Sequence, residues 1–229
     1  MATYLTLCQE MAREVGIPGS GPTTVAGQTG ELGDIVRYIR DADLDIKRRW
    51  HDWKFLWTST TDTSSVGSRS LVTGNPSDLG VWNRDMVVYD YDTDNYQRLD
   101  YIEWDEYIHS YKFGTVSNGT PEMFTLTPAG AIEMYPPASA VKNIYLEYWK
   151  KPEELSADGD ISIIPTEFHR IIIVRAKLYY AEHEDAPEVL VGSTAEFEDL
   201  LDNLESKYGR RQEARRMHQA FGVPVVEVM

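Results

Sequence analysis

The feature that most constrains this chain is a long two-faced helix predicted over residues 29–53. Its apolar residues recur at alternating steps of three and four, which places them in one stripe along a helix. A helix of this length with one apolar stripe needs partners. These are either helices near the two ends of the chain or further copies of the chain. The stripe consists of Leu32, Ile35, Ile39, Ala42, Ile46, Trp50 and Trp53.

Helical patterns near both ends of the chain supply such partners. Residues 3–15 are predicted as a first helix that Thr3 or Thr6 can cap. Pro165 suits the first turn of a third helix, which is expected to end within residues 183–187. Ser193 and Glu196 fit a capping box that begins a fourth helix. The buried faces of the last two helices are predicted to hold Phe168, Ile171, Ile172, Ala176, Tyr179, Tyr180, Phe197, Leu200, Leu201, Leu204 and Tyr208.

The middle of the chain reads as short strands separated by turn residues, which is typical of a small antiparallel sheet or sandwich. Residues 104–111 are the exception, since their aromatic spacing predicts a short helix. The predicted strands are 58–63, 86–91, 96–99, 123–127, 131–135 and 143–149, with a hairpin turn at 92–95.

This order predicts an α+β chain. The N- and C-terminal helices, residues 1–57 and 160–216, form an antiparallel helical bundle as one discontinuous domain. Residues 58–159 form a β-rich insertion, and 217–229 form an extended C-terminal docking tail. Within the bundle, the packing positions are predicted to be Leu32, Ile35, Ile39, Ile46, Trp50, Trp53, Phe168, Ile172, Tyr179, Phe197, Leu201 and Leu204.

The end of the chain is unusual because it is basic and then apolar. Arg210, Arg211, Arg215 and Arg216 suit the C-terminal end of a helix. The residues that follow are apolar and β-like, and Pro224 makes them a poor helix. Such a segment can dock on a partner by strand addition or by filling a groove, or it can fold back on its own domain. The apolar positions are Phe221, Val223, Val225, Val226 and Val228.

The sequence lacks the motifs of catalytic and cofactor sites. None of the five histidines forms a zinc-protease pattern, and the single cysteine, Cys8, excludes a cysteine-based zinc site. Asp90, Asp92 and Asp94 resemble the start of a calcium loop, but Asn95 and Tyr101 stand where that loop needs glycine and an acidic ligand. We therefore predict no enzyme activity, no metal ion and no cofactor. No apolar run is long enough for a membrane span.

The net charge of −15 argues against a protein that grips phosphates, because such proteins are usually basic. It is compatible with a wall past which DNA slides without binding, since like charges repel. It is equally compatible with a role in solubility alone.

Three segments resemble the start of phage head-to-tail adaptor proteins, and are similar to the tail tubular protein A and connector-adaptor families of tailed phages. They are residues 5–17 (LTLCQEMAREVGI), 29–31 (TGE) and 50–56 (WHDWKFL). The resemblance is strongest over about the first 57 residues, and the order of helices, strands and helices extends it along the chain.

The resemblance implies a structural protein without catalytic residues. Copies of the chain would form a ring, expected to be a dodecamer, on the portal protein of the capsid. The C-terminal segment would reach the portal, and the β-rich module would face the next tail component, a nozzle, tube or stopper. Double-stranded DNA would pass through without specific binding. The protein would be made in the host cytoplasm and reside at the head-tail junction of the virion, with no membrane contact.

One alternative of a different class is open at this stage. The β-rich region holds Trp82, Trp104 and Trp149 with many tyrosines, and aromatic rings can stack on sugars or fill a core. The alternative is a carbohydrate- or receptor-binding module of the virion.

Overall fold

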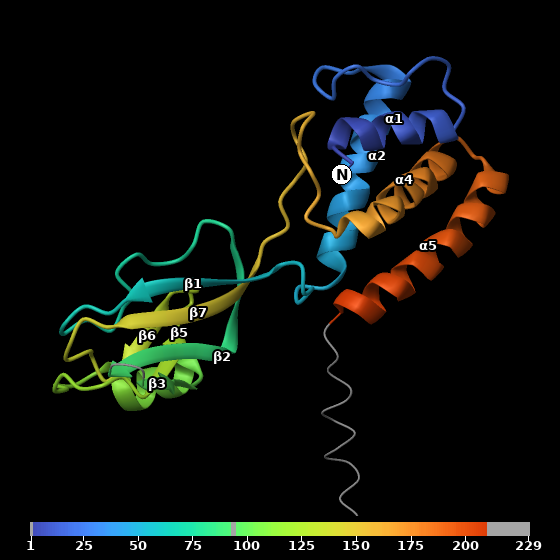
Figure 1. Ribbon diagram of the computed structural model, residues 1–229. Helices are drawn as coiled ribbons and strands as arrows, with labels where there is room; N and C mark the ends of the chain where they lie inside the picture. The colour runs from blue at the N-terminus through green and yellow to red at the C-terminus, as the bar shows by residue number, and fades with distance from the viewer. Residues whose placement is uncertain (1, 93–94, 210–229) are drawn as a thin grey trace, which may run out of the picture. The chain divides into compact units, whose positions relative to one another are not determined.

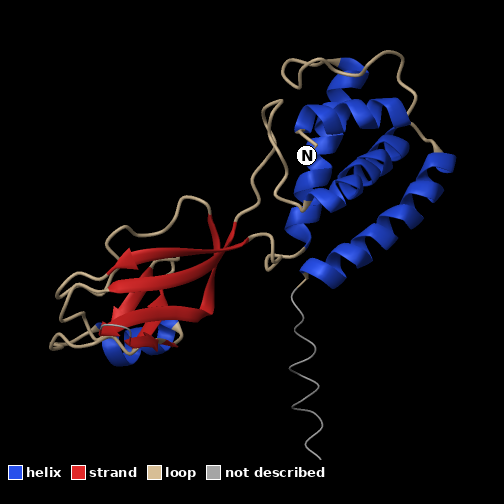
Figure 2. Ribbon diagram, viewed as in Figure 1, coloured by secondary structure: helices blue, strands red, loops and turns tan. Residues whose placement is uncertain are grey.

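The computed structural model describes residues 2–92 and 95–209. The chain divides into two compact units. The helical unit consists of Met1–Phe55 with Glu153–Met229, and the β unit is Leu56–Pro152. The prediction of a mixed α+β chain is confirmed, and the described residues contain five α-helices (Figures 1 and 2).

Four of those helices belong to the helical unit. Their bounds are α1 Tyr4–Glu14, α2 Gly30–Arg49, α4 His169–His183 and α5 Pro187–Tyr208, with a 3₁₀ turn at Thr166–Phe168 before α4. Thr3 caps α1, because its side chain accepts from the backbone of Thr6 while the Thr6 side chain accepts from the backbone of Thr3. Two of the four orphan amides at this helix end are thus satisfied locally.

The long helix α2 ends four residues earlier than predicted. Trp50 has extended backbone angles and is 48% exposed, so it lies outside the buried stripe and its predicted packing role is wrong. Trp53 is fully buried beyond the helix end, and its indole Nε1 donates to the carbonyl oxygen of Ile46 at 3.2 Å. This bond satisfies one of the four carbonyl groups that the end of α2 leaves without a helical partner.

The last helix begins earlier than predicted. Pro187 opens α5, where its fixed φ suits the first turn. Ser193 lies inside the helix and is buried, so it is not the cap that the sequence pattern indicated. The next residue, Thr194, donates its hydroxyl to the carbonyl oxygen of Leu190 at 2.8 Å, as a threonine within a helix does.

Helix α4 lies at the centre of the helical unit and contacts α1, α2 and α5 (Figure 1). Its sequence explains this position, because buried residues occur all around it rather than on one face. They are Ile171, Ile172, Ile173, Val174, Ala176, Leu178 and Ala181.

The β unit contains two sheets. The first has the order β1-β7-β2-β3 and is antiparallel throughout, and the second has the order β4-β5-β6 with a parallel pair, β4 and β5. The strands are β1 Trp57–Thr63, β2 Leu79–Asp92, β3 Asn95–Arg98, β4 Asp100–Tyr101, β5 Met123–Leu126, β6 Ile132–Tyr135 and β7 Asn143–Lys150.

Between β4 and β5, the predicted short helix divides into α3, Trp104–Tyr107, and a π-helical turn, Ile108–Lys112. The core of the β unit joins one face of the four-stranded sheet to the second sheet. Its members include Trp82, Val87, Tyr89, Phe124, Ile132, Met134, Ile144, Leu146 and Tyr148.

Candidate functional site

The structure places most of the predicted packing residues inside the helical unit. Leu32, Phe168 and Tyr179 are partly buried. The residues that are buried outright are Ile35, Ile39, Ile46, Trp53, Ile172, Phe197, Leu201 and Leu204. These side chains are therefore occupied by contacts within their own chain, and any surface for partners must be found elsewhere.

The predicted docking tail lies outside the described residues. This concerns the whole set Arg210, Arg211, Arg215, Arg216, Phe221, Val223, Val225, Val226 and Val228. In the described part of the chain, no helix is both long and apolar enough to traverse a bilayer. The same residues contain no group of three histidine, cysteine or carboxylate side chains arranged to hold a metal ion.

A buried ion pair anchors the segment that returns to the helical unit. Lys47 and Asp43 of α2 pair with side chains only 2% and 0% exposed. Ser162 donates its hydroxyl to Asp43, and Lys47 Nζ donates to the carbonyl oxygen of Glu153 at 3.0 Å. Burial raises the pKa of Asp43, although Lys47 and Ser162 act to lower it. The pair fixes residues 153–162 against α2, and it is not among the predicted sites. The spacing of Asp43 and Lys47, four residues apart on a helix, was the available signal.

One face of the four-stranded sheet is not part of the core of the β unit. Side chains alternate between the two faces along a strand. Leu146 and Tyr148 of β7 point into the core, so Tyr145 and Glu147 lie on the opposite face. Trp149 lies on the same face by this alternation, and the register adds Trp57 and Val81, which both pair with Trp149. We call this surface the open face, and it comprises Trp57, Ser59, Thr61, Val81, Asn83, Val88, Asp90, Tyr96, Arg98, Tyr145, Glu147 and the buried Trp149.

Large apolar side chains are exposed on the open face. Trp57 is 50% exposed, Val81 42%, Tyr96 65% and Tyr145 38%. Grouped exposed side chains of this kind are typical of a surface that contacts another protein.

A buried carboxylate orders part of the open face. Glu147 is 7% exposed and accepts from Trp57 Nε1 at 3.0 Å and from Tyr145 Oη at 3.2 Å. Asn83 Nδ2 donates to the same carboxylate at 3.2 Å. These bonds hold the exposed aromatic side chains in fixed positions, which reduces the entropy cost of binding a partner.

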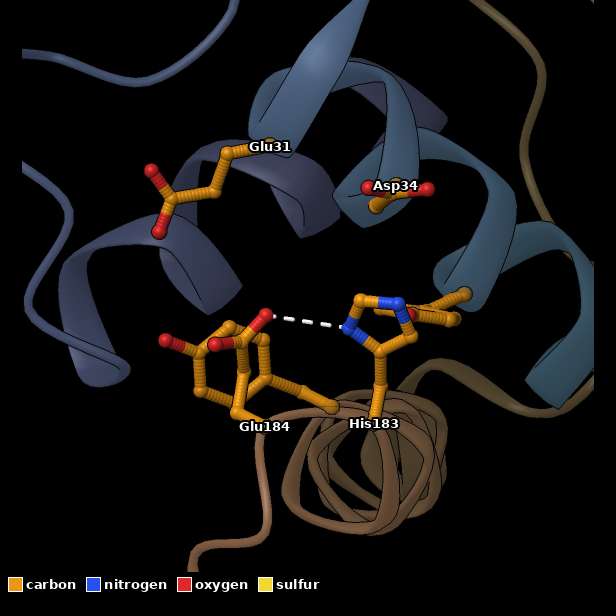
Figure 3. A pocket seen from close by; sticks show the side chains of 6 residues that line it. Glu31, Asp34, His183 and Glu184 are labelled. Carbon is orange, nitrogen blue, oxygen red and sulfur yellow. Dashed lines mark hydrogen bonds and ion pairs between the residues drawn. The ribbon is translucent and has the colours of Figure 1, made fainter.

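A second candidate is a pocket between the first turns of α2 and the last turn of α4 (Figure 3). We call it the acidic pocket. Its volume is about 330 Å³, and its lining consists of Glu31, Asp34, Tyr38, Tyr180, His183 and Glu184. A groove beside it shares Tyr38 and His183 and is completed by Arg37, Asp41, Tyr179 and Glu182.

The lining of the acidic pocket and groove is dominated by negative charge. Five carboxylates face one guanidinium, that of Arg37, and one imidazole. Asp34 pairs with Arg37 at 2.8 Å and Asp41 with Arg40 at 3.0 Å, and Glu184 Oε1 lies within hydrogen-bond distance of His183 Nδ1, at 3.0 Å. Among the described residues, this leaves Glu31 and Glu182 without an ion pair.

Two tyrosines of the acidic pocket, Tyr180 and Tyr38, are placed beside these carboxylates. Burial raises the pKa of Tyr180, and the carboxylates of Glu184 and Glu31 raise it further. Tyr38 is 7% exposed, and its hydroxyl has no hydrogen-bond partner among the described residues. The pocket thus combines acceptors, aromatic rings and a negative potential, and those features suit a cation.

Neither the open face nor the acidic pocket was predicted from the sequence. The open face left a signal in the alternation of residues 57–61 and 143–149. The acidic pocket left none, because it joins α2 and α4 across more than 140 positions of sequence.

The model of the family described as SU10 adaptor protein matches residues 2–224, which cover both compact units. No curated protein matches the chain.

Proposed function

The chain belongs to the SU10 adaptor protein family, and we propose that it is the structural head-to-tail adaptor of a tailed bacteriophage. In this role it forms a ring on the portal protein, extends the DNA channel and offers an attachment surface to the next tail component. The coarser prediction of a phage adaptor is confirmed by the family, which is structural and not a known class of enzyme. The observation that carries the proposal is that the match includes both the helical unit and the β unit.

The finer parts of the proposal come from the resemblance and the charge. A dodecamer and a likeness to tail tubular protein A stay predictions. The net charge of −15 supports a channel wall that repels the phosphates of passing DNA. We assign portal contact to the C-terminal segment, whose residues from Phe221 to Val228 are predominantly apolar. In this proposal the assembled protein is located at the head-tail junction of the virion.

We assign the open face of the β unit to the next tail component. Its exposed Trp57, Val81 and Tyr145 supply apolar area, and Glu147 orders two of these side chains before a partner binds. We do not assign this contact to the helical unit, because the apolar side chains that were predicted to need partners are largely buried within the unit itself.

The test combines the full-length chain with purified portal and measures the mass of the complex. We expect several copies per portal ring. Deletion of residues 217–229 should leave a folded protein, judged by circular dichroism, that no longer joins the portal. A truncated chain that joins normally would refute the role of the tail, and a full-length chain that ignores the portal would refute the adaptor proposal.

The open face is tested separately with Trp57→Ala and Tyr145→Ala together. This variant should still join the portal but should lose the next tail component from reconstituted particles. Val191→Ala is the matched control, because Val191 is 74% exposed on α5 and lies outside the open face. Equal tail attachment by all three proteins would contradict the assignment.

The carbohydrate-binding alternative rests on one observation, the exposed Trp57 and Tyr145 beside a carboxylate. Trp82 and Trp149 cannot contribute to it, because both are buried. A glycan array probed with the full-length chain separates the two functions. Saturable binding that Trp57→Ala abolishes would favour the sugar-binding function over the adaptor assignment of the open face.

A further inference from the structure

We propose that the acidic pocket of one copy receives an arginine side chain from the basic segment of a neighbouring copy, residues 210–216. This inference rests on the proposed ring, since it names one contact between adjacent subunits. In this proposal the end of the chain has two parts. The arginines bind the neighbouring copy, and the apolar residues that follow them bind the portal.

The chemistry of the acidic pocket selects a guanidinium. Carboxylates accept hydrogen bonds and cannot donate them, so the ligand must supply donors and positive charge. Tyr180 and Tyr38 add aromatic rings, on which a planar guanidinium stacks more readily than a hydrated ammonium does. The same combination already occurs at the edge of the pocket, where the Arg37 guanidinium lies 5.2 Å from the centroid of the Tyr38 ring.

An unsatisfied polar group provides independent support. The Tyr38 hydroxyl is the buried polar atom of the lining that lacks a partner among the described residues. Buried hydroxyl groups without partners are rare because each one costs desolvation free energy. A guanidinium N–H donor would supply the missing bond, whereas an apolar ligand would leave the hydroxyl unpaired.

The chain carries the matching cations. Arg210, Arg211, Arg215 and Arg216 fall within seven residues of a protein whose net charge is −15. Directly before them, Tyr208 ends α5 and its ring contacts that of Phe168 at 5.9 Å. The end of α5, which precedes the basic segment in the sequence, therefore lies beside the start of α4.

Distance favours a neighbouring copy over the same chain. The acidic pocket lies at the other end of α4, and fifteen helical residues span about 22 Å. The Cα atoms of Arg210 and Arg211 lie at most about 7 Å from Gly209, too short a span even with the length of an arginine side chain added. The Cα atoms of Arg215 and Arg216 lie at most about 20–25 Å from Gly209, so their side chains would reach the pocket of the same chain only from a largely extended segment. A second copy in a ring meets no such limit.

The first experiment is a charge exchange in the full-length chain, with copies per portal ring as the readout. Glu31→Lys with Glu184→Lys reverses the pocket, and Arg215→Glu with Arg216→Glu reverses the segment. Each pair alone should weaken association between copies by about tenfold or more, the effect of one charge-assisted contact. All four substitutions together should restore it. Circular dichroism confirms that every variant is folded.

The second experiment identifies which copy supplies the arginine. Glu31→Cys and Arg215→Cys are combined in one chain, and Cys8 does not interfere because it is fully buried. Oxidation of assembled rings should give covalent multimers on a non-reducing gel. An intrachain disulfide alone, or no disulfide, would overturn the proposal.

The outcomes separate this inference from the adaptor function. Variants that assemble on the portal as the wild type does would overturn the pocket contact and leave the adaptor role intact. Loss of portal binding on reversing the pocket, with no effect of reversing the segment, would show that the portal supplies the cation and would also overturn it. A wild-type chain that never joins the portal would instead remove the adaptor function itself.

Discussion

Replacing Lys47 by methionine should destabilise the helical unit more than any loss of a surface ion pair. Asp43 and Lys47 are 0% and 2% exposed, so the substitution leaves a carboxylate buried without its cation. Breaking a buried pair in this way costs about 3–5 kcal/mol. The matched control is Arg37→Met on the same helix, because Arg37 and Asp34 are 50% and 38% exposed. Loss of that pair should cost about 1 kcal/mol or less.

The loss of unfolding free energy caused by Lys47→Met should depend on pH, in a direction set by the pKa of Asp43. Burial raises the pKa of Asp43 above its unfolded value of about 3.9. Between the unfolded and the folded pKa of Asp43, the folded protein therefore binds more protons than the unfolded protein. The stability that Asp43 contributes is full at low pH and is lost as the pH rises through the folded pKa. Removing Lys47 takes away a charge that lowers this pKa and therefore raises it further. The difference in the free energy of unfolding between wild type and variant should be smaller at acidic pH than at neutral pH.

Urea unfolding followed by far-UV circular dichroism measures both effects. Adding Asp43→Asn to Lys47→Met removes the buried charge and keeps a hydrogen-bond acceptor for Ser162, so much of the loss should be recovered. The reasoning is refuted if Lys47→Met costs no more than Arg37→Met. It is also refuted if the cost is the same at both pH values.

Three further predictions concern single sites. Leu204→Ala should lower the free energy of unfolding by about 2–5 kcal/mol, because Leu204 is fully buried; thermal unfolding that matches the wild type would contradict this. Gly80→Ala should destabilise the β unit by about 1–3 kcal/mol, since the new Cβ would lie 2.8 Å from the carbonyl oxygen of Trp149. Gly159→Ala is its control, with nothing within 4 Å, and equal urea midpoints for the two variants would refute the clash. Burial raises the pKa of Cys8 to about 12, so a thiol reagent should label Cys8 only as fast as the protein unfolds. Rapid labelling of the native protein would show that the site is open.

The sequence predicted those elements whose signals are local. Thr3 and Thr6 indicated the start of α1, and the short runs between turn residues located β5, β6 and β7 closely. The capping-box prediction at Ser193 failed because the same residue pattern also fits the interior of a helix. Pro187 is the correct signal, because proline suits the first turn of a helix as well as the residues that follow one.

The candidate surfaces were beyond prediction because each depends on pairing between distant segments. Trp57 belongs to the open face only because β1 pairs with β7 in a register that sets Trp57 opposite Trp149. A shift of one residue would have turned it into the core. The acidic pocket likewise exists only because the start of α2 meets the end of α4. Periodicity identifies which side of a helix is apolar, and it does not identify which helix ends meet.

The segment that returns from the β unit explains how two distant parts of the sequence form one helical unit. Three N-terminal elements bond to it separately. The amide of Tyr4 donates to the carbonyl oxygen of Asp160 at 2.7 Å, the amide of Val25 to Asp158 Oδ1 at 2.6 Å, and Lys47 to the carbonyl oxygen of Glu153 at 3.0 Å. The helices before the insertion therefore cannot complete their contacts until the chain after it has been made.

The β unit lowers the entropy cost of this closure. Its first and last strands, β1 and β7, pair along their whole length, and the amide of Lys150 donates to the carbonyl oxygen of Leu56 at 2.9 Å. Once these strands have paired, the two connections to the helical unit start from neighbouring positions. The remaining loop to be closed is then a few residues rather than about a hundred, and the cost of closing a loop rises with its length. An insertion that begins and ends on adjacent strands can thus vary in its own surface, including the open face, while the helical unit keeps its fold.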